Sequence, residues 1–133
     1  MSIWSGETAA QILEESGFRC HYRGTKSANF SVPGPQRREI SIALERKNVV
    51  TAYVNRRSVI EQLFPADGID GVDLVELYPH GHVGKNGNPG IAGSVARHNP
   101  SLNPRTNEVL RLHLRDEISL RRLLSWYAPG NFP

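Results

Sequence analysis

Two β-rich runs, residues 39–45 and 49–55, stand on either side of a short polar turn in the middle of the chain. In the first run every second residue is apolar, with Ile40, Ile42 and Leu44 at the alternating positions. This period of two is that of a strand with one buried face. The second run is rich in β-branched and aromatic residues, which favour strands. The two runs predict a β-hairpin, so the fold must contain a sheet.

Shorter patterns predict the rest of the sheet. Apolar and basic residues alternate from Phe18 to Arg23, which predicts a strand with an apolar face and an exposed basic face. Further strands are predicted at residues 29–32, 72–78, 91–96 and 110–114. The strand at 72–78 is expected to be buried, and the strand at 91–96 has the weakest pattern.

Three helices are predicted from caps and from apolar spacing. Ser5 caps a first helix that ends near Gly17, and Asp116 caps the last helix. A short helix is expected at residues 59–64. The last helix is expected to bury an inner stripe of Ile118, Leu120, Leu123, Leu124 and Tyr127. We therefore predict an α+β fold with a mainly antiparallel (mixed) sheet, covered on one face by two to three helices.

Composition limits the class of protein. A chain of 133 residues fits one domain, which we place at 1–133. It lacks the roughly 20 consecutive apolar residues of a membrane span, and it has no secretory leader pattern, so we expect a cytoplasmic protein. The single Cys20 excludes an internal disulfide and a cysteine-type zinc site. No cofactor and no metal are expected.

Positive charge is concentrated in residues 18–57, which hold nine basic residues and two acidic ones. The basic residues are Arg19, Arg23, Lys26, Arg37, Arg38, Arg46, Lys47, Arg56 and Arg57. They lie on predicted strands and turns whose apolar faces belong to the core. This segment predicts a surface that binds nucleic-acid phosphates.

A second region, residues 78–107, contains no Asp or Glu and is rich in glycine, proline and asparagine. Its polar donors are His80, His82, Lys85, Asn86, Arg97, His98 and Arg105. Glycines permit close approach to a nucleic acid, and these donors suit base edges, so the region is expected to discriminate between targets. The alternative is a flexible surface connection.

Catalytic motifs are incomplete. Glu45 and Lys47 have the Glu-x-Lys spacing of metal-dependent nucleases, but no aspartate precedes Asp67 to complete the metal ligands, so neither is expected to be catalytic. His80, His82 and His98 have no nearby carboxylate to orient them on a metal.

We therefore interpret the chain as a nucleic-acid-binding domain that favours duplex DNA over RNA. A setting consistent with this is the target-recognition part of a restriction, repair or defence protein, with a separate catalytic domain or subunit. Two alternatives stay open. One is a small metal-independent ribonuclease or toxin that uses His80, His82 and His98 as acid and base. The other is a module whose basic face binds an acidic protein.

Overall fold

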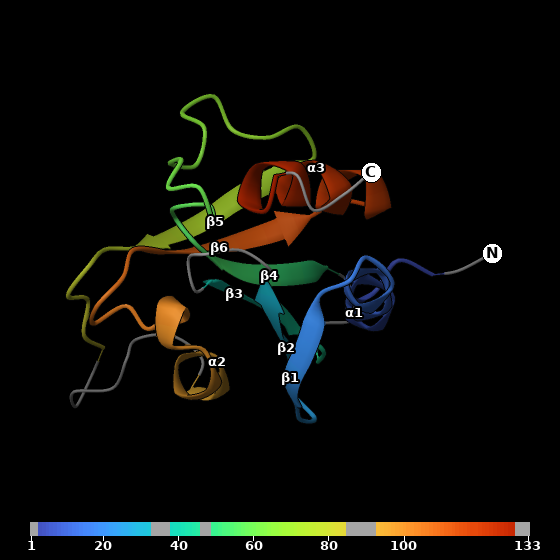
Figure 1. Ribbon diagram of the computed structural model, residues 1–133, viewed down its shortest axis with the longest axis horizontal. Helices are drawn as coiled ribbons and strands as arrows, with labels where there is room; N and C mark the ends of the chain where they lie inside the picture. Colours follow the sequence, from blue (N-terminus) through green and yellow to red (C-terminus); the bar gives the residue numbers. More distant parts are fainter. Residues whose placement is uncertain (1–2, 33–37, 46–48, 85–92, 130–133) are drawn as a thin grey trace.

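A six-stranded antiparallel sheet forms the centre of the computed structural model, which describes residues 3–32, 38–45, 49–84 and 93–129 (Figure 1). The strands are β1 (Arg19–Arg23), β2 (Ser27–Val32), β3 (Arg38–Ala43), β4 (Val50–Asn55), β5 (Val72–Tyr78) and β6 (Val109–Leu114). Their order across the sheet is β1-β2-β3-β4-β6-β5, and each neighbouring pair is antiparallel. The predicted hairpin is β3–β4, and the predicted α+β class is confirmed.

The helices are α1 (Gly6–Glu15), α2 (Gly93–His98) and α3 (Glu117–Tyr127), with a 3-10 turn, η2 (Pro100–Leu102), after α2. Both predicted caps are present. The Ser5 hydroxyl accepts the Thr8 N–H at 3.2 Å, and the Asp116 carboxylate accepts the Ser119 N–H at 2.8 Å. The hydrogen bonds from Ser119 lower the pKa of Asp116. No helix in the described ranges is both long enough and apolar enough to cross a membrane.

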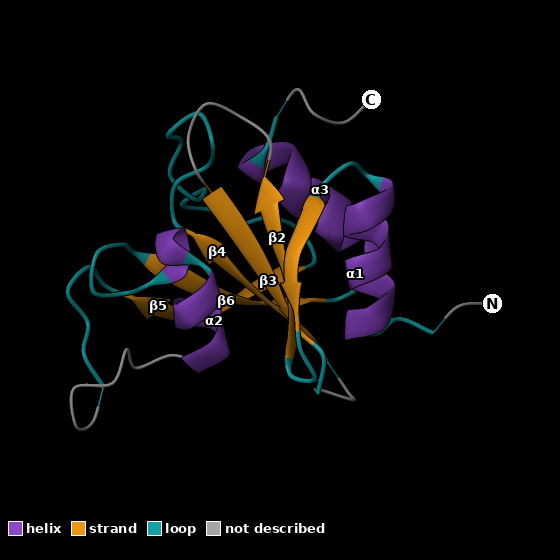
Figure 2. Ribbon diagram, turned by 60° about the horizontal axis from the view of Figure 1, so that its bottom comes forward, coloured by secondary structure: helices purple, strands orange, loops and turns teal. Residues whose placement is uncertain are grey.

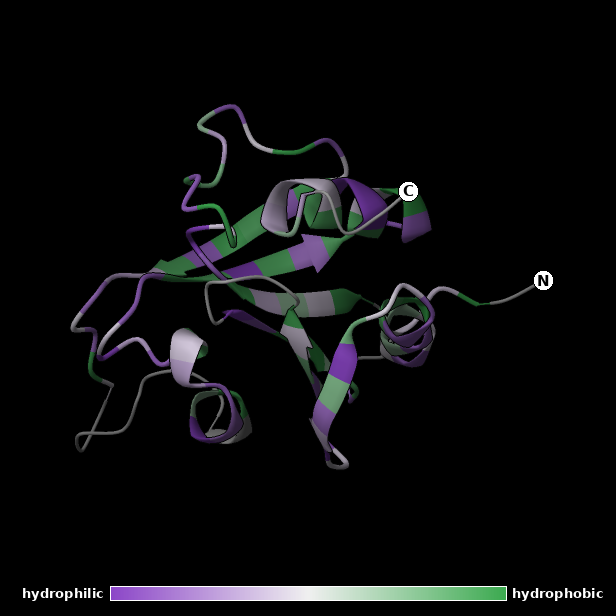
Figure 3. Cartoon of the chain, viewed as in Figure 1, coloured by the Kyte–Doolittle hydropathy of each residue, from purple (hydrophilic) through white to green (hydrophobic). Residues whose placement is uncertain are grey.

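The main core lies between the sheet and the pair α1 and α3. Hydrophobic and hydrophilic residues alternate along strands such as β6 (Figure 3), so each strand has one apolar face. Phe30, Ile40 and Leu112 are fully buried on that face, where they join Leu13 of α1 and Leu120 of α3 in one cluster. Burial of these side chains is the largest stabilising contribution to the fold.

The opposite face carries α2 and η2, so the prediction that helices cover one face is wrong (Figure 2). Here the buried strand residues are mostly polar, and a smaller apolar cluster joins Tyr53, Tyr78 and Val109 to Val95 and Leu102. We call this side of the sheet the polar face.

Three further predictions about elements are wrong. Residues 93–98 are helical where a strand was predicted, because the Asn99 side chain donates to the Val95 carbonyl at 2.8 Å and closes the last turn. The predicted helix at 59–64 is a turn, since the Ser58 hydroxyl accepts the N–H groups of Ile60 and Gln62. β5 is at the edge of the sheet, so its central residues are exposed where burial was expected.

Ile118 is the one misplaced residue in the predicted stripe of the last helix. It is 59% exposed, whereas Leu120, Leu123, Leu124 and Tyr127 are buried. The predicted turn signal at Asn86 and Gly87 lies outside the described residues.

Candidate functional site

A β-bulge in β1 decides where its aromatic and basic side chains point. The pairing with β2 runs from Cys20 opposite Phe30 to Tyr22 opposite Asn29, so one residue is extra on β1. Tyr22 consequently lies on the polar face, and not on the apolar face that the alternation predicted. Its ring stacks on the ring of His98 in α2, with centroids 3.6 Å apart and planes 13° apart.

His21, at the same bulge, fixes the contact between β1 and α2. One ring nitrogen, Nε2, is 3.0 Å from the His98 carbonyl oxygen, and the other, Nδ1, is 2.9 Å from the Ser31 hydroxyl. β1 and α2 are therefore joined by a stack and a hydrogen bond, although 77 positions separate His21 from His98 in the sequence.

Exposed cations surround this contact. Arg19 lies opposite Ser31 on the polar face, and Arg97 is exposed on α2. Lys26 shares a shallow pocket of about 130 Å³ with Tyr22. We call this surface the β1–α2 patch; it consists of Arg19, His21, Tyr22, Lys26, Arg97 and His98. The patch combines members of both predicted sets, and neither 19–26 nor 93–98 contains a carboxylate.

Three other predicted phosphate ligands are neutralised by carboxylates. Arg23 pairs with Glu7 of α1, and this hydrogen bond raises the pKa of Arg23. Arg38 pairs with Glu61 at 2.5 Å, and Arg56 pairs with Glu108 at 2.6 Å. These carboxylates come from outside the basic segment, so the local excess of positive charge overstates the cationic surface.

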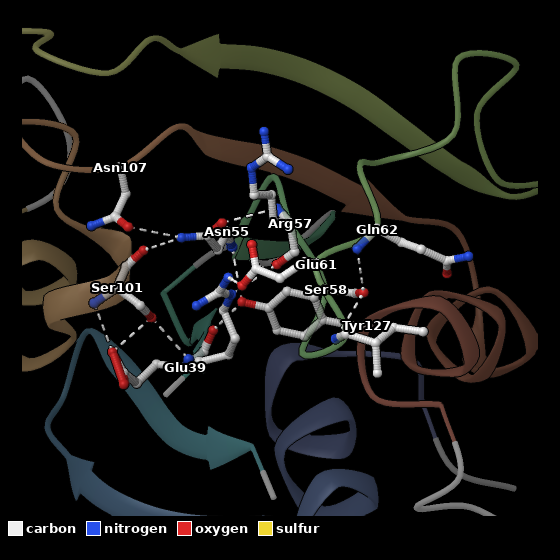
Figure 4. Close-up of polar contacts among 11 residues, drawn as sticks. Glu39, Asn55, Arg57, Ser58, Glu61, Gln62, Ser101, Asn107 and Tyr127 are labelled. Carbon is white, nitrogen blue, oxygen red and sulfur yellow. Dashed lines mark hydrogen bonds and ion pairs between the residues drawn. The ribbon is translucent and has the colours of Figure 1, made fainter. Parts of the chain in front are cut away.

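A polar pocket lies at the end of the sheet where β3 begins and β4 ends (Figure 4). It has a volume of about 360 Å³. Antiparallel pairing brings the start of β6 and the residues after β5 to the same end. The lining residues include Arg38, Asn55, Arg57, Glu61, His80 and Asn107. We call it the Arg57 pocket.

Tyr127 of α3 holds the two strands apart beside this pocket. Regular pairing of β3 with β4 spans Ile40↔Val54 to Ile42↔Ala52. Beyond it, the Tyr127 hydroxyl donates to the Glu39 carbonyl at 2.7 Å and accepts the Asn55 N–H at 2.9 Å. Burial raises the pKa of Tyr127, so its hydroxyl stays protonated.

Buried hydrogen bonds fix η2 to both strands. The Glu39 carboxylate, on a residue that is 2% exposed, accepts the N–H and the hydroxyl of Ser101 at 2.8 and 2.7 Å. The Asn55 side-chain amide donates to the Ser101 carbonyl and to the Asn107 side chain. Buried polar groups satisfied in this way confer a defined geometry.

Arg38 clamps the segment that lines the pocket. Its Nε donates to the Arg57 carbonyl at 3.0 Å, and its Nη2 donates to Glu61. Only 11% of the Arg38 side chain is exposed. Glu61 has a φ of 65°, in the left-handed region that non-glycine residues rarely adopt.

The other predicted site residues are dispersed. His82 packs edge-on against Tyr78, at 5.5 Å between centroids, while His80 lines the Arg57 pocket and His98 stacks on Tyr22. In the ranges that the structure describes, no three metal-binding side chains come together. Arg105 is exposed in the turn before β6. The following predicted residues lie outside the described residues: Arg37, Arg46, Lys47, Lys85 and Asn86.

Two important residues were missed from the sequence. Tyr22 was assigned to the core, because a bulge leaves no signal in a period-two pattern. Glu61 was placed on a helix, and nothing in the sequence indicates its pairing with Arg38. Comparison of the chain with family models, with curated proteins and with solved structures finds no match. The function is therefore argued from the geometry of these two sites.

Proposed function

We propose that this domain binds nucleic acid through the β1–α2 patch and that it prefers single strands. The observation that carries the proposal is the stack of Tyr22 on His98, together with the exposed cations Arg19, Lys26 and Arg97 on the same strand, turn and helix. The cations supply attraction for phosphates. Tyr22 is 41% exposed as a residue, and a base would stack on the part of the ring pair that His98 and Gly24 leave open.

The preference for single strands follows from the kind of contact. Aromatic side chains bind nucleic acid by stacking on bases, which requires bases that are not paired and stacked in a duplex. The neutralisation of Arg23, Arg38 and Arg56 also reduces the extended phosphate-binding surface that suits a duplex. The duplex DNA predicted from the sequence stays as the competing interpretation.

Fluorescence anisotropy with matched single-stranded and duplex oligonucleotides tests the proposal. Tyr22→Ala should weaken single-strand binding about 5- to 150-fold, since a stacked base contributes about 1–3 kcal/mol. Arg19→Ala and Lys26→Ala should each reduce the log–log salt slope by about 0.7, the value for one phosphate contact on a single strand. Arg121→Ala is the control for net charge, because Arg121 is an exposed arginine on α3 that pairs with Glu117.

Three outcomes would contradict the proposal. The first is that Tyr22→Ala binds single strands as tightly as the Arg121→Ala control, which would show that no base stacks on Tyr22. Tighter binding of the duplex would favour the original prediction. Equal competition by polyglutamate would favour an acidic protein partner.

A further inference from the structure

We propose that the Arg57 pocket cleaves single-stranded RNA without a metal, by transfer of a phosphoryl group to the neighbouring 2′-oxygen. The inference rests on the proposed binding of nucleic acid at the β1–α2 patch. Its basis is that a carboxylate, an imidazole and a guanidinium, from Glu61, His80 and Arg57, line one pocket.

Glu61 is placed as a proton acceptor. Arg38 holds one carboxylate oxygen, Oε1, and no hydrogen bond reaches Oε2 from the described residues. The side chain is 47% exposed, so a substrate hydroxyl can reach it. Glu61 has a left-handed backbone conformation, and backbone strain of this kind clusters at functional sites.

Arg57 and His80 supply the other two requirements. Two of the described arginines line this pocket. Arg38 pairs with Glu61, whereas no carboxylate of the described residues lies within ion-pair distance of the Arg57 guanidinium. Arg57 can therefore bind a phosphate and stabilise the charge that develops on it. His80 is exposed on the loop after β5, and an imidazolium is a suitable proton donor to a leaving oxygen.

The patch and the pocket belong to one rigid surface. β1 and β4 are separated by three inter-strand spacings of about 4.8 Å, and the pocket lies further along, since Tyr22 is level with Tyr53 and the pocket begins at Asn55. Between them, the Asn99 amide donates to Asn29 at 2.7 Å, and Ser101 is hydrogen-bonded to Glu39 and Asn55. α2 and η2 cover the polar face between Tyr22 and the pocket, so a strand stacked on Tyr22 has to cross their outer surface to enter the pocket.

The reaction balances without a further reactant. The 2′-hydroxyl gives its proton to Glu61 as its oxygen attacks phosphorus, which forms the O2′–P bond. The P–O5′ bond breaks, and the His80 imidazolium gives its proton to O5′. The products are a 2′,3′-cyclic phosphate and a 5′-hydroxyl end. Arg57 contacts the non-bridging oxygens, and Arg38 positions Glu61. DNA lacks the 2′-oxygen and should stay intact.

The first experiment incubates the protein with end-labelled single-stranded RNA in EDTA and identifies the product ends. We expect cyclic phosphate ends, and no cleavage of the matching DNA or of 2′-O-methyl RNA. Glu61→Gln and His80→Ala should each lower kcat at least about 100-fold, the smaller end of the effect of a general acid or base. His82→Ala is the matched control, since His82 contacts Tyr78 and does not line the pocket.

A modified substrate distinguishes the loss of a proton donor from a structural effect of the substitution. RNA with sulfur in place of O5′ has a leaving group that needs no proton, so it should restore cleavage by His80→Ala but not by Glu61→Gln. For the positioning role, Arg38→Gln should lower kcat and leave KM unchanged, and Arg38→Lys should recover part of the loss.

Binding and cleavage are measured separately, so the two proposals can fail separately. The Glu61→Gln and His80→Ala variants should bind RNA as the unmodified protein does. RNA binding without cleavage by the unmodified protein, or cleavage that survives both substitutions, would overturn the present inference and leave the binding proposal intact. If no nucleic acid binds, both proposals fail.

Discussion

Glu61 has a strained backbone conformation, and its side chain forms an ion pair with Arg38. Its backbone is left-handed, and its carboxylate is fixed by an arginine that also contacts the Arg57 carbonyl. A glycine would adopt this backbone without strain. The contacts of Arg38 with Glu61 and with the Arg57 carbonyl hold the segment in this conformation.

Comparison of Glu61→Gly with Glu61→Ala tests this cost. Both substitutions remove the ion pair with Arg38, so they differ only in the backbone. We expect the glycine variant to be more stable by about 1–2 kcal/mol, because a left-handed conformation costs an L-residue about that amount. Urea denaturation measures the difference. Equal stability of the two variants would show that the segment relaxes when the ion pair is lost.

At the scale of elements, the turn before β5 shows how closely the second half of the chain packs. Gly71 has a φ of 80°, and a Cβ placed on it would lie 1.9 Å from the Ser119 hydroxyl oxygen on α3. Position 71 therefore requires glycine for two reasons: its φ is positive, and α3 leaves no room for a Cβ atom.

Gly71→Ala should accordingly destabilise the protein more than Gly68→Ala. Gly68 has a nearly identical φ of 79°, but nothing lies within 4 Å of its added Cβ. We expect an extra loss of about 1–3 kcal/mol at Gly71, the typical cost of overpacking. The free energy of unfolding in urea measures it, and the double variant with Ser119→Ala should recover part of the loss. Equal losses at Gly71 and Gly68 would mean that α3 moves aside without cost.

Elements defined by a long periodic pattern could be predicted from the sequence, as α1, the β3–β4 hairpin and α3 show. The errors arose where a side chain redirects the backbone. Ser58 and Asn99 do this by hydrogen bonds that are local but have no periodic signal. The exposure of β5 follows from its place at the edge of the sheet, which depends on the whole topology.

The candidate sites were predictable to a smaller extent. Arg19, Lys26 and Arg97 were identified from charge, because exposed basic residues remain basic in any fold. Their position near Tyr22 on one face could not be predicted, because it depends on the bulge in β1. The Arg57 pocket was also missed, because residues from four separate segments form it.

At the scale of the whole molecule, ion pairs between residues that are distant in the sequence neutralise part of the basic segment. Glu7, Glu61 and Glu108 neutralise arginines that lie 16, 23 and 52 positions away in the sequence. Among the described residues of the basic segment, Arg19, Lys26 and Arg57 remain without such a pair, so the cationic surface is smaller than the segment predicts.

Removal of one neutralising carboxylate should therefore enlarge the nucleic-acid surface. Glu7→Gln releases Arg23, which lies next to Tyr22 on the edge strand β1 but on the α1 side of the sheet. A strand that passes around this edge should bind more tightly, and the salt slope should steepen by up to about 0.7. Glu117→Gln is the control, because it changes the net charge equally but releases Arg121 on α3. A salt titration compares the two variants. Equal gains would show that net charge matters and position does not.

The two faces of the sheet differ in how their covering elements are attached. α1 and α3 are held by apolar burial, while α2 and η2 are held by hydrogen bonds of Asn99, Ser101 and Asn107 as well as by the smaller apolar cluster of Val95 and Leu102. The segment from α2 to β6 is thus a replaceable cover with a small number of anchoring points. Substitutions between those anchoring points should therefore leave the sheet beneath them unchanged.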